Sequence, residues 1–457
     1  MDVVKINERD NVGVDIESGH KYALNPIKNG DDVIKYGYPI GVATSDIEVG
    51  DHVHSHNIKS KLGDILEYKY TPDIVEFPKN TPVKINAFVR ENGDIGIRND
   101  IWIIPTVGCA NAAAEQIARK TNAISFTHPY GCSQLGDDMT TTQLVLRGLI
   151  KHPNAGGVLV LGLGCENNNL KEMKNILGDF NAERIRFLNL QDCEDEISDG
   201  VKIVEELKAV ADKDKRETVS ISRLKVGLKC GGSDGYSGIT ANAVVGLLTD
   251  KIVSMGATAV MTEVPEMFGA EEILFNRCVN EEVFNKSVSL INDFKQYYKD
   301  HGMPISENPS PGNKEGGITT LEEKSLGCVQ KGGCAPITDV LTYGDTVTKA
   351  GLNLLDGPGN DIVSVTNLAA AGCHMVLFTT GRGTPLGGAV PTLKISSNNN
   401  IAVKKPHWID FNAFGDNKAQ ICEDLLSLVT EVANGKETNN ETHGYREIAI
   451  FKDGVTL

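Results

Sequence analysis

Short apolar runs alternate with helix-period segments along most of the chain. From residue 101 onward, each run of aliphatic and β-branched residues is followed by a turn of small residues and then by a segment with helical periodicity. The predicted strand–helix pairs are 101–104/112–120, 157–163/170–177, 184–190/201–211, 224–228/241–255, 257–262/270–301 and 351–355/361–371, with a last strand at 374–379. Such hydrophobic strands alternating with helices are typical of parallel sheets covered on both faces. The pattern predicts a multidomain α/β protein with Rossmann-like parallel domains.

The first part of the chain has a different pattern. Short β segments at 3–6, 22–24, 33–36 and 40–44 are bounded by Gly, Asp, Asn or Pro, and no helical period fits them. Prolines at 72, 78 and 82 then favour an extended connector. We therefore predict a small all-β module at 1–66, an extended linker at 67–97, a middle α/β domain at 98–223 and a C-terminal α/β domain at 224–457.

Composition narrows the class of protein. The 457 residues exceed one ordinary domain of roughly 100–200 residues. The chain carries 45 basic and 61 acidic residues, a net charge of −16 that repels phosphate backbones, so no nucleic-acid partner is expected. No run approaches the ~18 apolar residues of a membrane helix, and the N-terminus does not resemble a signal peptide. Ten widely spaced cysteines do not resemble a secreted disulfide framework, so a cytoplasmic location is expected.

Chemically active side chains follow several of the predicted strands. In open α/β sheets, ligands bind beyond the carboxyl ends of the strands. Six strand ends carry three Gly-linked cysteines, two carboxylates and one arginine, namely Cys109, Cys165, Cys230, Glu263, Asp356 and Arg382. A single cysteine there is more often a small buried hydrophobe than a ligand, and Asp356 also suits a turn. Arg382 between two glycines is better suited to gripping a carboxylate.

Further cysteines and three histidines are candidates either for core packing or for chemistry. Cys193, Cys278 and Cys422 fall in helix-like stretches that suggest core packing, whereas Cys328 and Cys334 lie in a Gly-rich segment that leaves both readings open. In an extended strand His52, His54 and His56 would share one face, where imidazoles can bind a metal or transfer protons. The alternative is a solvated polar strand face.

Ordered sequence blocks carry a family resemblance over nearly the whole chain. They are HVHSHN at 52–57, GIRN at 96–99 with IWIIPTVGCAN at 101–111, KCGGSDGYSG at 229–238, GGITTLEEKSLGCVQKGG at 316–333, and FTTGRGTP at 378–385. Together they resemble the altronate dehydratase and galactarate dehydratase family, and the triple histidine with YKYTP at 68–72 is similar to the altronate branch. The resemblance implies a β-clip (SAF-like) module at 1–66, a dimerising middle domain, a Rossmann-like metal-site domain at the C-terminus, and a homodimer.

The resemblance also implies a reaction, the dehydration of D-altronate to 2-keto-3-deoxy-D-gluconate with a divalent metal, Fe²⁺ or Mn²⁺. Removing the weakly acidic carbon-2 proton requires stabilising the adjacent carboxylate, and losing the carbon-3 hydroxyl requires an acid or a metal. The candidate site residues are His54, His56 and Lys229 for catalysis, Asn57, Ser233, Arg382 and Thr384 for the small-molecule sugar acid, and Cys230, Glu263 and His52 for the metal. We expect the β module to fold over the strand-end rim and bring the histidines to the metal site.

Three alternatives remain open at this point. The same site could act as a galactarate dehydratase or as a sulfolactate sulfo-lyase, which changes the substrate or the leaving group. A [4Fe-4S] cluster held by Cys230, Cys328 and Cys373 could replace the single metal ion. A sugar-acid-binding protein without turnover could use the same fold, although the histidines and strand-end thiols argue against it.

Overall fold

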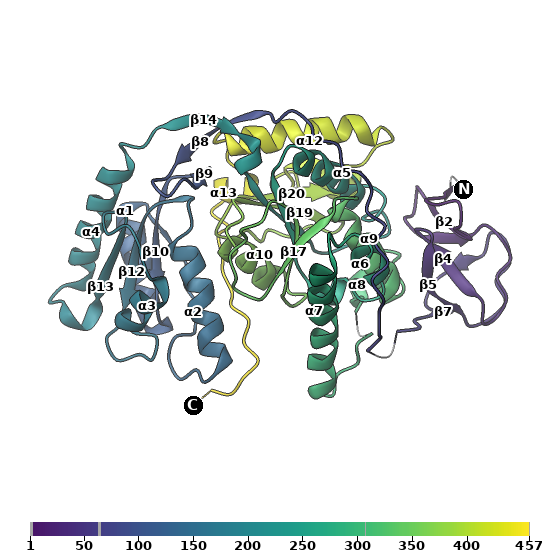
Figure 1. Ribbon diagram of the computed structural model, residues 1–457, viewed down its shortest axis with the longest axis horizontal. Coiled ribbons are helices and arrows are strands. Elements are labelled where there is room, and N and C mark those ends of the chain that lie inside the picture. Colours follow the sequence, from purple (N-terminus) through teal and green to yellow (C-terminus); the bar gives the residue numbers. More distant parts are fainter. Residues whose placement is uncertain (1–2, 63–64, 307, 457) are drawn as a thin grey trace.

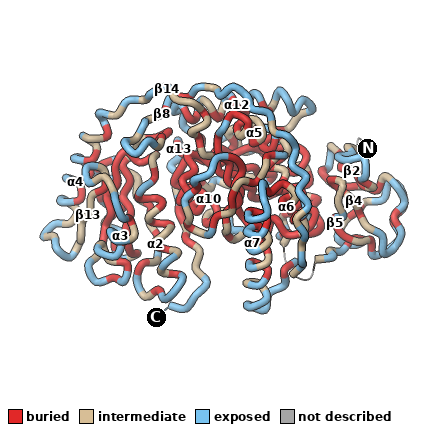
Figure 2. The backbone as a smooth tube through the Cα atoms, in the orientation of Figure 1, coloured by how far each residue is buried: buried red, intermediate tan, exposed pale blue. Residues whose placement is uncertain are grey.

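The computed structural model describes residues 3–62, 65–306 and 308–456. Its three folded parts lie side by side, with the C-terminal domain in the middle, the second domain on one side and the N-terminal β module on the other (Figure 1). Buried residues gather inside each part (Figure 2). The predicted fold class, a small all-β module followed by parallel α/β domains, is confirmed.

The β module consists of two small antiparallel sheets, and each takes its last strand from the end of the module. The first sheet has the order β1-β2-β3-β6 and the second has the order β4-β5-β7. The strands are β1 (Val3–Val4), β2 (Val12–Asp15), β3 (Lys21–Ala23), β4 (Asp32–Lys35), β5 (Tyr38–Ala43), β6 (His52–Val53) and β7 (Ile58–Lys59). The four predicted strands are present, and β2, β6 and β7 are additional.

The predicted linker at 67–97 is too long. Residues 65–83 form no helix or strand, but β8 (Lys84–Val89) and β9 (Ile95–Gly96) form a sheet with β14 (Arg216–Ser220) in the order β14-β8-β9. Ile85 and Ala87 of β8 are buried, which is the alternation of a half-buried strand. The remaining connector is pinned to the C-terminal domain, because Asp73 N donates to Asn276 O and Asn80 N donates to Ser254 O.

The second domain is a four-stranded parallel sheet in the order β11-β10-β12-β13. Its strands are β10 (Asp100–Pro105), β11 (Ile124–Ser125), β12 (Ala155–Gly162) and β13 (Ile185–Asn189). Helices α1 (Asn111–Thr121) and α4 (Glu196–Ala211) pack on one face, and α2 (Asp137–Ile150) and α3 (Leu170–Leu177) pack on the other. The predicted pairs place these elements within a few residues, but β11 and α2 were not predicted.

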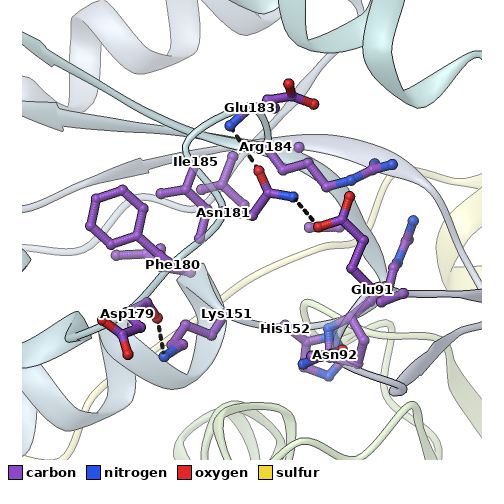
Figure 3. Close-up of a pocket in the computed structure, with 16 residues that line it drawn as sticks. Glu91, Asn92, Lys151, His152, Asp179, Phe180, Asn181, Glu183, Arg184 and Ile185 are labelled. Carbon is purple, nitrogen blue, oxygen red and sulfur yellow. Dashed lines mark hydrogen bonds between the residues drawn. The ribbon is translucent and has the colours of Figure 1, made fainter.

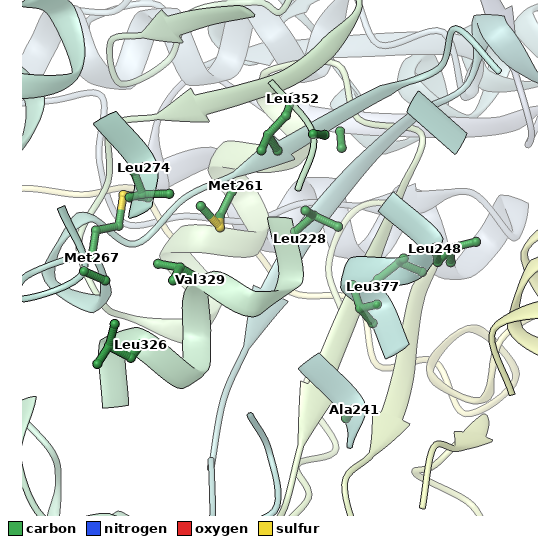
Figure 4. Close-up of a cluster of buried hydrophobic side chains, with 14 of the residues drawn as sticks. Leu228, Ala241, Leu248, Met261, Met267, Leu274, Leu326, Val329, Leu352 and Leu377 are labelled. Carbon is green, nitrogen blue, oxygen red and sulfur yellow. The ribbon is translucent and has the colours of Figure 1, made fainter. Parts of the chain in front are cut away.

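The C-terminal domain is built on a seven-stranded parallel sheet in the order β17-β18-β16-β15-β19-β20-β21. Its strands are β15 (Lys225–Cys230), β16 (Thr258–Met261), β17 (Ile337–Leu341), β18 (Gly351–Leu355), β19 (Met375–Thr380), β20 (Thr392–Ser396) and β21 (Phe411–Asn412). Leucine and methionine side chains of β15, β16, β18 and β19 pack with those of neighbouring helices in the core (Figure 4). Strand β15 lies between β16 and β19, where the strand order reverses, and ligands bind at such switch points.

Helices cover both faces of this sheet. They are α5 (Ala241–Ser254), α6 (Glu271–Phe275), α7 (Glu281–Asp300), α8 (Pro311–Glu315), α9 (Leu321–Val329), α10 (Asp361–Ala370), α11 (Asn399–Lys404), α12 (Lys418–Ala433) and α13 (Asn439–Thr442). The single helix predicted at 270–301 is two helices, because the Asn280 side chain caps a new helix by accepting from Val283 N. Within the described residues, no helix is long and apolar enough to cross a membrane.

The β module docks on the C-terminal domain through α9, every residue of which is buried. The Glu323 carboxylate of α9 accepts from Lys21 Nζ and Lys35 Nζ of the module, each at 2.8 Å. Thr320 Oγ1 donates to Ile40 O at 2.5 Å, and Lys21 Nζ also donates to Gly317 O at 3.0 Å. These contacts hold the module next to the carboxyl edge of the seven-stranded sheet.

Candidate active site

A cavity of about 1160 Å³ lies at the carboxyl edge of the seven-stranded sheet. The loops that follow β15, β16, β18 and β19 line it together with α8. Three residues predicted from the strand-end rule, Glu263, Arg382 and Thr384, face this cavity. The position agrees with the ligand site of open α/β sheets, beyond the carboxyl ends at the switch point.

A smaller cavity in the second domain is a poorer candidate. This cavity, of about 740 Å³, is lined by residues at the amino ends of β12 and β13 and by the loop after β8. Its polar side chains are used to hold the loops together, since Asn181 Nδ2 donates to Glu91 Oε2 and Lys151 Nζ donates to Asp179 O (Figure 3). None of the predicted site residues lies there, so it is a gap between structural elements.

Lys229 is a fixed cation beneath the cavity. Its fully buried Nζ donates to Glu263 Oε1 at 2.6 Å and to Asp361 Oδ1 at 2.7 Å. Burial alone would lower the pKa of Lys229, but Glu263 and Asp361 raise that pKa well above its usual value. Lys229 is therefore held as a cation between two carboxyl groups.

Glu263 presents a carboxyl group to the same cavity. Its backbone has a left-handed φ of 74°, which turns the chain sharply after β16. The Oε2 atom is buried and has no hydrogen-bond partner within the described residues. Burial, and then the charge of nearby Glu266, raise the pKa of Glu263 well above its usual value. A carboxyl group with a raised pKa that faces a cavity is suited to act as a general acid.

Three metal-ligand side chains meet beside this carboxyl group. Cys230 Sγ lies 3.0 Å from Glu266 Oε2 and 3.3 Å from Cys328 Sγ, and the three ligand atoms lie within 4.8 Å of one another. Two sulfurs and one carboxylate oxygen are a mixed donor set that fits a divalent transition metal such as Fe²⁺. Of the predicted ligands, Cys230 belongs to this group, whereas Glu263 is bound to Lys229 and His52 lies in the β module.

Lysines surround the thiol–carboxylate group. Lys331 Nζ lies 2.8 Å from Cys230 Sγ, and Lys324 Nζ lies 3.0 Å from Glu266 Oε1. The hydrogen bond from Cys328 and the charge of Lys331 lower the pKa of Cys230 to about 7, although burial opposes this. The thiolate that a metal requires is therefore available near neutral pH.

The histidines of the β module form a cluster, although the strand argument that predicted it is wrong. Only His52 belongs to β6, and residues 55–57 form a turn. The His52 ring nevertheless lies 5.3 Å from the His54 ring and 5.8 Å from the His56 ring. His20 joins them, with its Nδ1 3.1 Å from His52 Nε2. Burial, and then His20 and His54, lower the pKa of His52 to about 4, so this imidazole is neutral.

The histidine cluster reaches the cavity through α8. His54 Nε2 lies 3.0 Å from the carbonyl oxygen of Lys314, a residue that lines the cavity. Arg382 Nη1 donates to Gly312 O at 2.9 Å, on the same short helix. Helix α8 therefore lies between His54 and Arg382, and no direct contact between the histidines and Cys230 is seen among the described residues.

Two predicted substrate-binding residues support loops instead of lining the cavity. Asn57 is buried, where its Nδ2 donates to His52 O and its Oδ1 accepts from His54 N, so it shapes the histidine turn. The backbone oxygen of buried Ser233 accepts from Asn313 Nδ2 and ties the loop after β15 to α8. Both residues position groups that do face the site.

The three cysteines suggested for a [4Fe-4S] cluster do not converge. Cys230 ends β15 and pairs in register with Thr379 near the end of β19. Cys373 precedes β19, so it lies at the opposite edge of the parallel sheet, where its carbonyl oxygen contacts His152 Nε2. Cys328 alone lies beside Cys230.

Sequence reasoning missed the roles of His20, Glu266 and Cys328. Glu266 lies three residues past the flagged strand-end Glu263, within the same turn. Cys328 was left undecided, because its position on a helix gives no sign of the neighbouring strand. His20 lies in a module whose strand pairing sets its distance to His52.

Comparison with known proteins identifies the family. Residues 1–61 match the altronate/galactarate dehydratase SAF domain, residues 87–212 match the second domain of D-galactarate dehydratase/altronate hydrolase, and residues 221–456 match the C-terminal domain of D-galactarate/altronate dehydratase. The second range begins within the predicted linker, as strand β8 does.

Three known proteins are similar to this chain over nearly their whole lengths. The altronate dehydratase of Bacillus subtilis is 52% identical over 97% of this chain and 93% of its own. The altronate dehydratase of Escherichia coli is 51% identical over the same shares. The galactarate dehydratase (L-threo-forming) of Escherichia coli is 30% identical over 95% of this chain and 90% of its own. The chain therefore belongs to the D-galactarate/altronate dehydratase family and is a hydro-lyase that dehydrates a sugar acid.

Proposed function

We propose that the substrate is D-altronate and that the product is 2-keto-3-deoxy-D-gluconate. The identity of 51–52% with altronate dehydratases, against 30% with a galactarate dehydratase, supports this choice. The observation that carries the proposal is the cavity at the carboxyl edge, which is lined by the Arg382 guanidinium, by Glu263 with its raised pKa, and by Glu266 of the metal-ligand group.

Arg382 binds the substrate carboxylate in this proposal. Its side chain is about half exposed, at 49%, and lines the cavity. Nη1 contacts Gly312 O and Glu315 Oε2, which fixes one corner of the guanidinium. A guanidinium has five N–H donors and grips a carboxylate in a bidentate fork. This contact stabilises the carboxylate as negative charge develops next to carbon-2.

Proton transfers are assigned to the histidine cluster and to Glu263. His54 takes the carbon-2 proton, and the electrons of that C–H bond form the bond between carbon-2 and carbon-3. Glu263 gives its proton to the carbon-3 hydroxyl, which leaves as water. The enol then takes a proton at carbon-3 and loses the proton of its carbon-2 hydroxyl, which gives the 2-keto acid. An imidazole that accepts a proton and a carboxyl group with a raised pKa are the required pair.

Cys230, Glu266 and Cys328 are the residues that would hold a divalent metal, with Fe²⁺ preferred and Mn²⁺ as the alternative. A bound metal supplies Lewis-acid stabilisation of the carboxylate or of the departing oxygen. Lys331 and Lys324 keep the sulfur and the carboxylate in their ionised forms. A homodimer and a cytoplasmic location remain parts of the proposal.

The substrate is tested with the whole enzyme, loaded anaerobically with ferrous iron and supplied with D-altronate, galactarate or sulfolactate. We expect 2-keto acid from D-altronate at a kcat/KM at least tenfold above that for galactarate. A preference for galactarate, or release of sulfite from sulfolactate, would replace the proposed substrate. Tight sugar-acid binding without turnover would indicate a binding protein.

The histidine assignment has its own test. His54→Ala and His56→Ala are compared with His301→Ala, an exposed histidine at the end of α7 that serves as the control. We expect the first substitution to lower kcat by roughly 10²–10⁴-fold, the usual contribution of a general base. Wild-type turnover in both cluster variants, with unchanged metal content, would show that the histidines take no part.

A further inference from the structure

A cysteine follows every strand of the four-stranded sheet in the second domain. The residues beyond β10, β11, β12 and β13 are, in that order, Cys109, Cys132, Cys165 and Cys193. The first three thiols are exposed and unpaired, and each follows a glycine. All four strands are parallel, so the four cysteines lie at one edge of the sheet. The dehydratase chemistry proposed above uses none of them.

Backbone contacts lock the three Gly-Cys loops together. Gly108 N donates to Tyr130 O at 2.9 Å, which joins the loops of Cys109 and Cys132. Asn168 N donates to Gly131 O at 3.0 Å, which joins the loops of Cys132 and Cys165. A side-chain hydrogen bond from Thr106 Oγ1 to Glu166 Oε1, at 2.9 Å, joins the loops of Cys109 and Cys165.

Glycine is required where these loops meet. A Cβ atom at Gly131, whose φ is +99°, would lie 2.0 Å from Thr106 O. A Cβ at Gly108 would lie 3.1 Å from His128 O. At Gly131 the loops therefore approach one another more closely than a side chain would permit, and at Gly108 a side chain would be tightly packed. The strand register also places two of the cysteines at the same level. Pro105 pairs with Leu161, and Cys109 and Cys165 lie four residues beyond these two partners.

The fourth cysteine is turned away. Cys193 Sγ donates to Asn189 O at 3.3 Å, and burial raises the pKa of this thiol. Three exposed thiols thus remain on adjacent loops. Exposed thiols are prone to oxidation, and three at one edge are a liability unless they bind a ligand.

The three thiols are not gathered closely enough for a single metal ion. One tetrahedral metal ion with metal–sulfur bonds of about 2.3 Å needs sulfurs roughly 3.8 Å apart. Within the described part of this domain, no three cysteine, histidine or acidic ligand atoms lie within 4.8 Å of one another. Thiolates on an iron–sulfur cluster bind different irons and stand farther apart than those on one ion.

We propose that Cys109, Cys132 and Cys165 bind a [4Fe-4S] cluster, with the fourth iron left to an exogenous ligand. Binding is a ligand exchange in which each protein thiol gives its proton to a departing thiolate, forms one iron–sulfur bond and breaks another, without change of oxidation state. The site lies in a different domain from the thiol–carboxylate group at Cys230.

The test uses the full-length chain, kept anaerobic and mixed with a preformed [4Fe-4S] complex of 2-mercaptoethanol, then desalted. We expect about four iron atoms and four sulfide ions per chain, with absorbance at about 400 nm. Cys109→Ser, Cys132→Ser and Cys165→Ser should each lower the retained iron at least fivefold. Cys193→Ser and Cys334→Ser, the latter at an exposed cysteine of the C-terminal domain, are the controls and should retain it.

Three outcomes would overturn the proposal. They are a wild-type chain that retains no iron and sulfide after desalting, full retention by the three single variants, and loss of the cluster in Cys328→Ser instead. Circular dichroism of each variant checks that the fold is intact, which is expected because the three thiols are exposed. Cluster content is measured without turnover, so the result is independent of the sugar-acid substrate.

Discussion

Glu323 holds the β module against the C-terminal domain, and replacing it tests whether that docking is needed for activity. Its carboxylate, 1% exposed, accepts from the ammonium groups of Lys21 and Lys35. Glu323→Gln keeps the size of the side chain and removes the charge. The substitution leaves two buried ammonium groups without their counter-charge, while Cys230 and its neighbours stay in place.

The cost follows from the two lysines. Burial lowers the pKa of Lys21 to about 8 even with the charge of Glu323 beside it, so in the variant this pKa falls further and Lys21 can shed its proton. Burial alone would lower the pKa of Lys35 as well, but Glu323 raises it above its usual value. The substitution removes that charge, so Lys35 loses its counter-charge while it remains fully buried. Removing one partner of a buried ion pair costs ~3–5 kcal/mol, which weakens docking by roughly two to four orders of magnitude.

The assay combines limited proteolysis of the connector at 65–83, thermal unfolding and turnover at saturating substrate. We expect faster cleavage, a lower first unfolding transition and reduced kcat with unchanged iron content. Glu323→Gln combined with Lys35→Met should recover part of the loss, since the double variant no longer buries the Lys35 ammonium without a counter-charge. Unchanged cleavage and unfolding in Glu323→Gln would refute the reasoning. Because Glu323 has a depressed pKa in the folded state, its contribution should be present above pH ~4.3 and lost as pH falls.

The other predictions concern the cavity. Glu263→Gln should lower kcat by roughly 10²–10⁴-fold, and the decline in rate as pH rises through the pKa of this acid should disappear from the pH profile, because only the protonated carboxyl donates. Arg382→Lys should lower kcat/KM by roughly 10–100-fold, the loss of about 1.5–3 kcal/mol from a charged hydrogen bond, seen mainly as a raised KM; an unchanged KM would place the carboxylate elsewhere. Cys328→Ala should reduce bound iron measured by elemental analysis, whereas Cys334→Ala should retain it; equal iron contents would exclude Cys328 as a ligand.

Local sequence pattern predicts the parallel domains well. The strand and helix at 351–355 and 361–371 match β18 and α10 within one residue, because a buried strand and its following helix are visible in consecutive residues. The sheet of β8, β9 and β14 was missed, since β14 pairs with β8 from far along the chain. The sequence of α9, with Glu322, Glu323 and Lys324 in succession, is typical of a surface helix, yet every residue of α9 is buried.

The site was predicted in part for a similar reason. Cys230, Glu263 and Arg382 follow strands, so the carboxyl-end rule finds them from the sequence. Cys328 lies on α9, which no strand-end rule reaches, and only the packing of α9 on the sheet brings its sulfur to Cys230. The histidine cluster was predicted from alternation along a strand, but a turn and the neighbouring strand β3 assemble it.

The connector at 65–83 keeps the β module close to the C-terminal domain. Tyr70 OH donates to Cys278 O, and Asp73 and Asn80 add backbone contacts to the C-terminal domain, so the tether is held along its length. A module released from α9 stays close to its docking surface, and its return is an intramolecular step at high effective concentration. Dilution of the protein should therefore leave the docked fraction unchanged.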